Sequence, residues 1–128
     1  TTAREPVVRA DWIRPGTHIS AMGADTAGKQ ELDADLLLRA TVWVDDWAQA
    51  SALGECQHAA KRGLTREAIR GTLCDVLDGK AVRRTRDDEI TVFDSTGMAI
   101  QDLMIAAWAV RRAEATGDGA VHRIDLAR

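Results

Sequence analysis

Asp25 is the first residue whose type and position suggest chemistry. It follows the apolar run at residues 17–23 and shares a loop with Gly23, which lets the backbone approach a flat ligand. A carboxylate there can take a proton or orient water, provided that partial burial raises its pKa toward neutrality. An aspartate in a turn also commonly bonds its own backbone. Lys29 could hold Asp25 ionised, contact a ligand, or be a solvated residue at a helix start.

The second candidate is the segment Asp94-Ser95-Thr96-Gly97, which follows a β-branched run beginning at Ile90. If a helix opens directly after it, free backbone amides and hydroxyls would suit a polar ligand edge such as a carboxamide. The alternative is that Ser95 or Thr96 caps the helix and satisfies the same amides without a ligand.

Both segments need elements that bring them together. Alternating or β-branched residues predict strands at residues 17–23, 41–46 and 90–94. Apolar spacing of three to four, or alanine-rich composition, predicts helices at residues 30–40, 47–62, 65–78 and 98–115. The last helix is apolar on nearly all sides, so we expect it to be buried.

This alternation predicts an α/β fold, namely one half of a doubly wound parallel sheet with helices on both faces. Open parallel sheets bind ligands beyond the carboxyl ends of their strands. We therefore expect Asp25 and Ser95 to flank one crevice.

Composition excludes several classes of protein. The chain has 128 residues, of which 45% are hydrophobic, enough for one compact domain. Its net charge of -3, with both signs interspersed, gives no footprint for nucleic acid. No apolar stretch approaches the roughly 20 residues that a bilayer span needs. We expect a soluble, cytoplasmic protein without nucleic-acid or membrane partners, in which Cys56 and Cys74 are buried, reduced thiols.

Other polar groups favour structural roles. Cys56 and His58, beside Glu55, lack a second ligand pair at metal-binding spacing, so no metal site is predicted. His18 falls in a predicted strand and is expected to be a hydrogen-bonded residue in or near the core. The four cations within residues 80–86 precede acidic residues and are expected to pair locally at the surface.

Three ordered motifs resemble the ornithine cyclodeaminase/mu-crystallin family, and the match runs from about residue 5 to about residue 115. The motifs are Arg14-Pro15-Gly16-Thr17-His18-Ile19, Met22-Gly23-Ala24-Asp25-Thr26-Ala27-Gly28-Lys29-Gln30-Glu31-Leu32, and Asp88-Glu89-Ile90-Thr91-Val92-Phe93-Asp94-Ser95-Thr96-Gly97 with Gln101-Asp102. The resemblance implies the second half of a Rossmann-like domain and a long C-terminal helix returning toward a substrate and dimerisation region.

Members of this family act on small α-amino or cyclic imino acids by deaminating cyclisation, alanine dehydrogenation or ketimine reduction. The resemblance implies hydride transfer between the substrate α-carbon and nicotinamide, with Asp25 as the catalytic aspartate that assists proton or water chemistry. It also implies that Gly23, Lys29, Ser95 and Thr96 bind the cofactor, NAD or NADP.

The resemblance also divides the chain. Residues 1–97 are expected to form the C-terminal half of an NAD(P)-binding domain, and residues 98–128 a connecting helix and a loosely tied tail. The phosphate-binding glycine motif and the family's substrate-binding basic residues have no counterpart here. We therefore expect a truncation or cleavage product that needs an N-terminal half or a complementing chain, rather than an enzyme with Thr1 as nucleophile. The complete protein is expected to bind a small amino or imino acid and to form a homo-oligomer.

A non-catalytic role is the alternative. A half domain leaves an open sheet edge beside an apolar helix, and such an edge associates with other chains unless it is covered. The chain would then be an interaction module that assembles through this edge without a cofactor.

Overall fold

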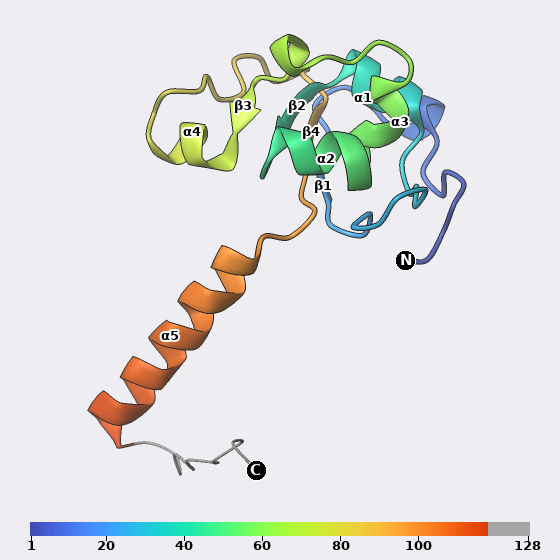
Figure 1. Cartoon of the computed structure of the whole chain (residues 1–128). Helices are drawn as coiled ribbons and strands as arrows, with labels where there is room; N and C mark the ends of the chain where they lie inside the picture. Colours follow the sequence, from blue (N-terminus) through green and yellow to red (C-terminus); the bar gives the residue numbers. More distant parts are fainter. Residues whose placement is uncertain (118–128) are drawn as a thin grey trace. The chain divides into compact units, whose positions relative to one another are not determined.

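The computed structural model describes residues 1–117 and divides the chain into two compact units, Thr1–Gly97 and a second that begins at Met98 (Figure 1). The tail after Gly117, which the sequence predicts to be loosely tied, lies outside the described residues. Among residues 1–117, no helix has the length and apolar character needed to cross a bilayer.

A four-stranded sheet forms the centre of the first unit (Figure 1). Its strands are β1 (His18–Ala21), β2 (Thr41–Val44), β3 (Gly71–Thr72) and β4 (Thr91–Asp94). All strand pairs are parallel, and the order across the sheet is β1-β4-β2-β3. The predicted parallel α/β sheet is confirmed, and β4 places the carboxyl ends of β1 and β2 on either side of its own.

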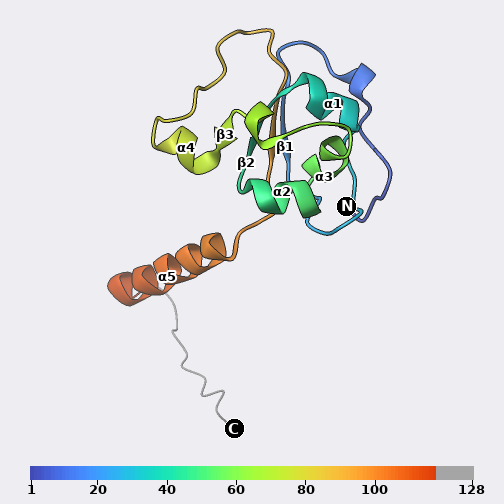
Figure 2. The ribbon, with the colours of Figure 1, turned by 45° about the horizontal axis from the view of Figure 1, so that its top comes forward.

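Three short helices pack on one face of this sheet (Figure 2). They are α1 (Ala34–Arg39), α2 (Trp47–Leu53) and α3 (Cys56–Ala60). The core between sheet and helices contains fully buried aliphatic side chains from both layers, including Leu36, Leu37, Val44 and Val92. Side chains alternate along a strand, so the intervening residues of β2 and β4 point to the other face.

The predicted helix at residues 47–62 is interrupted between α2 and α3. Gly54 has an extended conformation (φ -82°, ψ -171°), and a Cβ on this residue would lie 2.7 Å from a carboxylate oxygen of Asp94. The interruption lets the backbone amides of Glu55 and Cys56 donate to Asp94 at 3.1 and 2.8 Å. A buried carboxylate therefore replaces continuous helical hydrogen bonding at this point.

The predicted helix at residues 65–78 is wrong over much of its length. The chain forms a 3-10 turn at Arg66–Ala68, then β3, and only then the short helix α4 (Leu73–Leu77). The amide of Arg70 donates to the carbonyl of Val42 at 2.8 Å, and β3 pairs with β2. Pairing with a neighbouring strand overrides the helical spacing of the apolar residues here.

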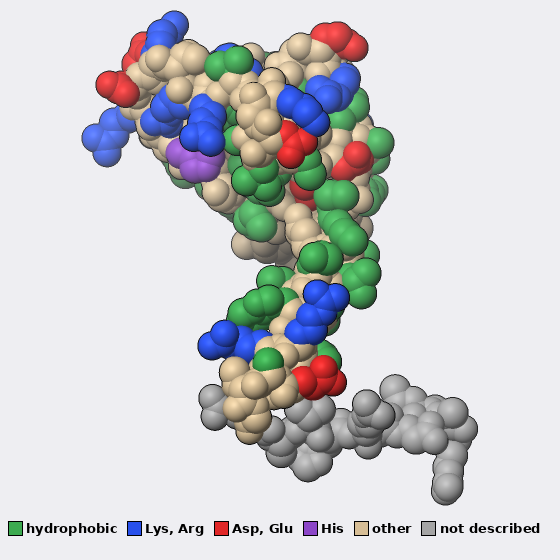
Figure 3. All heavy atoms as spheres, turned by 90° about the vertical axis from the view of Figure 1, so that its left-hand side faces the viewer, with side chains coloured by type: hydrophobic (Ala, Val, Ile, Leu, Met, Phe, Trp, Pro, Cys, Tyr) green, Lys and Arg blue, Asp and Glu red, His purple; other side chains and the backbone are tan. Residues whose placement is uncertain are grey.

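The described part of the second unit is the helix α5 (Ala99–Thr116), which ends at Gly117 in a left-handed conformation with φ 63°. The prediction that this helix is buried is wrong, because none of its residues is buried. Figure 3 shows apolar side chains exposed along it. The large ones are 53–68% exposed: Ile100, Leu103, Met104, Ile105, Trp108 and Val110.

The inward face of α1 can be tested with two leucines. Leu36 is 0% exposed and Leu38 is 41% exposed. We expect Leu36→Ala to lower the free energy of unfolding by about 2–5 kcal/mol, because the cavity it leaves is enclosed. Leu38→Ala should cost less than about 1 kcal/mol. Urea unfolding of the two variants measures both values, and equal losses would contradict this placement of the helix.

Candidate functional site

The loops that carry Asp25 and Ser95 leave the sheet at the carboxyl ends of neighbouring strands. The last residues of β1 and β4, Ala21 and Asp94, are partners in the parallel register. The amide of Ser95 donates to the carbonyl of Ala21 at 2.9 Å. The two loops therefore begin side by side, at the edge where open parallel sheets bind ligands.

Asp25 is an exposed carboxylate with two partners. Its Oδ1 accepts hydrogen bonds from Lys29 Nζ at 2.6 Å and from the Thr26 hydroxyl at 3.0 Å. The hydrogen bond from Lys29 is the main reason that the pKa of Asp25 lies below its ordinary value. The partial burial that would raise this pKa is therefore not found, since the side chain is 55% exposed and ionised at neutral pH.

Lys29 and Gly23 shape the same loop. Lys29 pairs with Asp25 and does not lie at a helix start, because α1 begins at Ala34. Gly23 lies against Glu31, and a Cβ on Gly23 would collide with the Glu31 carboxylate. The space beside this glycine is thus filled by a side chain of the chain itself.

Glu55 anchors the far end of the Asp25 loop. Its carboxylate accepts the backbone amides of Glu31 at 2.8 Å and Leu32 at 3.0 Å. The side chain is 1% exposed, and burial raises its pKa to about 7. Sequence reasoning considered Glu55 only as a metal ligand and missed this role. An acidic residue inside an alanine-rich apolar segment was the signal available.

Gln57 and His58 hold the middle of the loop. Gln57 Oε1 accepts the amide of Gly28 at 2.7 Å, and its Nε2 donates to the carbonyl of Lys29 at 3.2 Å. His58 Nε2 lies 2.8 Å from the same carbonyl. Within the described part of the chain, no group of three or more His, Cys, Asp or Glu is arranged to hold a metal ion. The start of α3 is therefore a polar platform for the Asp25 loop.

The loop after β4 is held by another buried carboxylate, Asp45. Asp45 is 6% exposed and accepts the amides of Thr96 and Gly97 at 2.8 and 2.9 Å. The amides expected to be free for a ligand are thus already bonded. The alternative cap by Ser95 or Thr96 is also not formed, since the N-cap of α5 is Met98 and has no side-chain cap bond.

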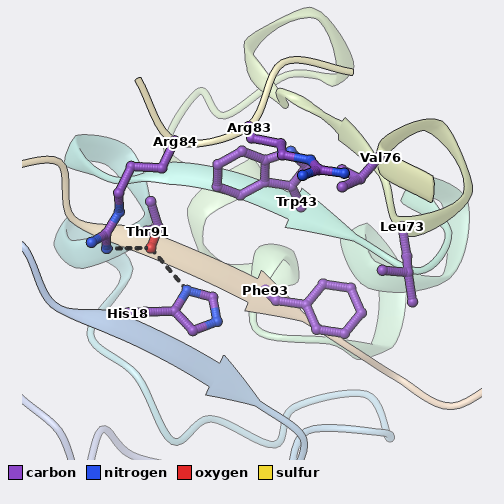
Figure 4. A pocket seen from close by; sticks show the side chains of 8 residues that line it. All are labelled: His18, Trp43, Leu73, Val76, Arg83, Arg84, Thr91 and Phe93. Carbon is purple, nitrogen blue, oxygen red and sulfur yellow. Dashed lines mark hydrogen bonds between the residues drawn. The ribbon is translucent and has the colours of Figure 1, made fainter. Parts of the chain in front are cut away.

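A cavity of about 340 Å³ opens on the sheet face opposite α1–α3 (Figure 4). It is lined by the strand residues His18, Trp43, Thr91 and Phe93, and by Leu73, Val76, Arg83 and Arg84 from α4 and the following loop. The cavity shares no residue with the Asp25 or Ser95 loops. Helices are expected on both faces, and α4 is the one helix of the first unit that borders this face.

The remaining polar predictions are settled by local contacts. His18 Nδ1 lies 2.8 Å from Thr91 Oγ1, so His18 is hydrogen-bonded as predicted, although its side chain is exposed. Local pairing at the surface is confirmed for Arg86, which donates to Asp88 at 2.9 Å. Both cysteines are free thiols. Cys56 is buried, whereas the expected burial of Cys74 is wrong because it is exposed.

Comparison with known proteins places this geometry in context. The family model described as "Ornithine cyclodeaminase/mu-crystallin family" matches residues 1–117. Over 107 residues the chain is 48% identical to an alanine dehydrogenase of Archaeoglobus fulgidus, which covers 83% of this chain and 33% of that protein. The chain therefore spans about a third of the length of this relative.

Two solved structures resemble the chain closely. A dimeric archaeal alanine dehydrogenase with bound NAD has a TM-score of 0.87 and 42% identity, over 98% of this chain and 39% of that one. A Thermococcus litoralis Delta(1)-pyrroline-2-carboxylate reductase in complex with NADH and L-proline has a TM-score of 0.87 and 33% identity, over 95% of this chain and 38% of that one.

The anchor at Glu55 makes a prediction about pH. The folded-state pKa of about 7 exceeds the ordinary value of 4.5, so the folded state binds more protons between these limits. Its contribution to stability is fully present below pH 4.5 and is lost as the pH rises through 7. We expect the free energy of unfolding to fall by on the order of 3 kcal/mol across this range.

Urea unfolding of Glu55→Gln at several pH values measures this contribution. The variant should lose most of the slope between pH 5 and pH 8. Glu67→Gln is the matched control at an exposed glutamate and should keep the slope. An unchanged slope in Glu55→Gln would show that another group titrates.

Proposed function

Because the chain belongs to the ornithine cyclodeaminase/mu-crystallin family, we propose that it carries the nicotinamide side of the active site of an NAD-dependent enzyme for small α-amino or cyclic imino acids. The observation that supports this most is the start of the Asp25 and Ser95 loops at neighbouring carboxyl ends of a parallel sheet. The reaction class is deaminating cyclisation, alanine dehydrogenation or ketimine reduction.

The described residues fit one end of the cofactor. An ionised carboxylate and a loop rich in hydroxyl and carbonyl oxygens, at Asp25 and at Ser95-Thr96, suit a nicotinamide and a substrate nitrogen. No glycine-rich phosphate motif is present in the 128 residues, so the diphosphate must be bound elsewhere. The cofactor, when bound, supplies or accepts a hydride. Gly23 and Lys29 complete the proposed contact set.

Asp25 is the proposed catalytic residue. Its exposed carboxylate can accept a proton from a substrate nitrogen or orient a water molecule toward an imine carbon. Lys29 keeps this carboxylate ionised at neutral pH through the 2.6 Å hydrogen bond, and the lowered pKa favours orienting a water molecule over strong basicity. The α3 platform fixes the backbone that follows Asp25 and so limits where the carboxylate can move.

The rest of the enzyme is proposed to come from an N-terminal half or a complementing chain. Residues 1–97 then form the second half of the nucleotide-binding domain, and residues 98–128 lead toward the substrate and dimerisation region. Phosphate binding, the choice between NAD and NADP and most substrate selection belong to the complementing part. We propose a cytoplasmic homo-oligomer, and a dimer is what the archaeal alanine dehydrogenase forms.

One observation favours a second candidate function. Strand β1 lies at an edge of the sheet, with no strand on its outer side among residues 1–117. A chain that pairs through this edge would act as a non-catalytic interaction module. NAD-dependent turnover of the chain joined to an upstream half separates the two candidates, because the interaction module should assemble but show no turnover.

The catalytic role of Asp25 can be measured after the chain is joined to the upstream part of the A. fulgidus alanine dehydrogenase. We expect NAD-dependent turnover of an amino acid, and we expect Asp25→Asn to lower kcat by at least about 100-fold while NADH binding is retained. Asp35→Asn is the matched control. Asp35 is 56% exposed and ion-paired with Arg62, much as Asp25 is with Lys29.

The outcomes separate the parts of the proposal. Full turnover in Asp25→Asn contradicts the catalytic assignment alone. Absence of both dinucleotide binding and turnover in a folded joined protein contradicts the proposed function. A similar loss of kcat in both variants indicates a general structural effect rather than chemistry at Asp25.

A further inference from the structure

Every hydrogen-bond donor of residues 95–97 has a partner within the first unit. The Ser95 amide donates to the carbonyl of Ala21, as described above. The other four donors reach Asp45: Ser95 Oγ at 3.1 Å, Thr96 N at 2.8 Å, Thr96 Oγ1 at 3.1 Å and Gly97 N at 2.9 Å. Three consecutive residues therefore have five donors, and all five are occupied.

These bonds are difficult for a ligand to displace. Asp45, Ser95 and Thr96 are 6%, 3% and 8% exposed, so little water is available to replace a lost partner. A buried carboxylate that loses donors suffers a large desolvation cost, and its hydrogen bonds are stronger than those between neutral groups. To accept a hydrogen bond from an N–H or O–H of this loop, a ligand oxygen would have to displace the Asp45 carboxylate from that donor.

The same hydrogen bonds determine whether the hydroxyls of Ser95 and Thr96 can donate or accept a further hydrogen bond. A serine or threonine hydroxyl has one proton and two lone pairs. Because Asp45 takes both protons, Ser95 and Thr96 can only accept a further hydrogen bond. The backbone carbonyls of the loop are also acceptors. The carbonyl of Gly97 already accepts Gln49 Nε2 at 2.6 Å. Among the groups of residues 95–97 themselves, an approaching ligand therefore meets only acceptors.

We propose that Asp45 makes the Ser95–Gly97 loop an acceptor-only surface, which recognises a nicotinamide carboxamide through its NH2 group rather than its carbonyl oxygen. The choice of nicotinamide as the ligand rests on the proposed function. That the loop's donors are already bonded rests on the contacts of Asp45. Asp45 does not touch the ligand in this proposal. It is a positioning residue that acts through Ser95 and Thr96.

Asp46 provides a matched control. It is the adjacent aspartate, and its carboxylate accepts the amide of Gln49 at 2.8 Å at the start of α2. No hydrogen bond joins its side chain to the loop after β4 in the described structure. Asp46→Asn thus makes the same chemical change one residue away without altering the donors of residues 95–97.

Amide hydrogen exchange of the full chain, measured by NMR, tests the positioning role without any cofactor. In Asp45→Asn, the amides of Thr96 and Gly97 should lose at least about tenfold in protection relative to the amide of Val92, because the charged acceptor is gone. Asp46→Asn should leave that ratio unchanged. Unchanged protection in Asp45→Asn would overturn the proposal.

Binding to the joined protein tests the recognition itself. The probes are NAD and its 3-acetylpyridine analogue, in which a methyl group replaces the carboxamide NH2. We expect the parent protein and Asp46→Asn to bind the analogue at least about fivefold more weakly, through loss of one hydrogen bond. In Asp45→Asn the ratio of the dissociation constants of the analogue and NAD should fall below about twofold, since Ser95 is then able to donate.

Equal binding of both dinucleotides by the parent protein, or an unchanged ratio in Asp45→Asn, would overturn the acceptor-only assignment. If neither dinucleotide binds, the proposed function fails. The hydrogen-exchange result then decides the role of Asp45 by itself.

Discussion

Buried carboxylates that must be surrounded by donors are the constraint on which the arrangement of this fold depends. Asp94, at the end of β4, is 0% exposed, and burial raises its pKa. Removed from water, it is stabilised by the backbone amides at the start of α3. The chain breaks its helix at Gly54 to provide those amides. A single requirement for hydrogen bonding thus sets the position of α3 against the sheet.

The same kind of bonding, from the start of α3 and from the end of β2, fixes the two candidate loops. Glu55 holds the backbone after Asp25, and Asp45 holds the backbone around Thr96. Each loop is fixed by an acid that belongs to another element, and neither acid is a proposed reactant. Reactive groups on loops need this kind of support, because a loop alone does not hold a side chain within the small tolerance that catalysis demands.

The sequence predicts much of the scaffold and less of what fixes the loops. Strands β1, β2 and β4, and the placement of Asp25 beyond β1, follow from local apolar patterns and motifs. Strand β3 does not, because Ile69 and Leu73 have helical spacing and only pairing with β2 makes that segment extended. The partners of Asp45 lie 51 and 52 residues away for Thr96 and Gly97, so no local pattern reveals them. The apolar composition of α5 predicts burial, but composition does not say what covers a helix, and none of its residues is buried.

Gly54 has an evolutionary consequence that follows from its surroundings. Its φ of -82° is open to any amino acid, so the backbone itself does not demand glycine. The demand comes from across the fold, because the first carbon of a side chain would enter the space held by the carboxylate of Asp94 and the methyl group of Thr96. A larger residue can therefore replace Gly54 during evolution only if the residue at position 94 or 96 also changes. Substitutions at these three positions are thus coupled.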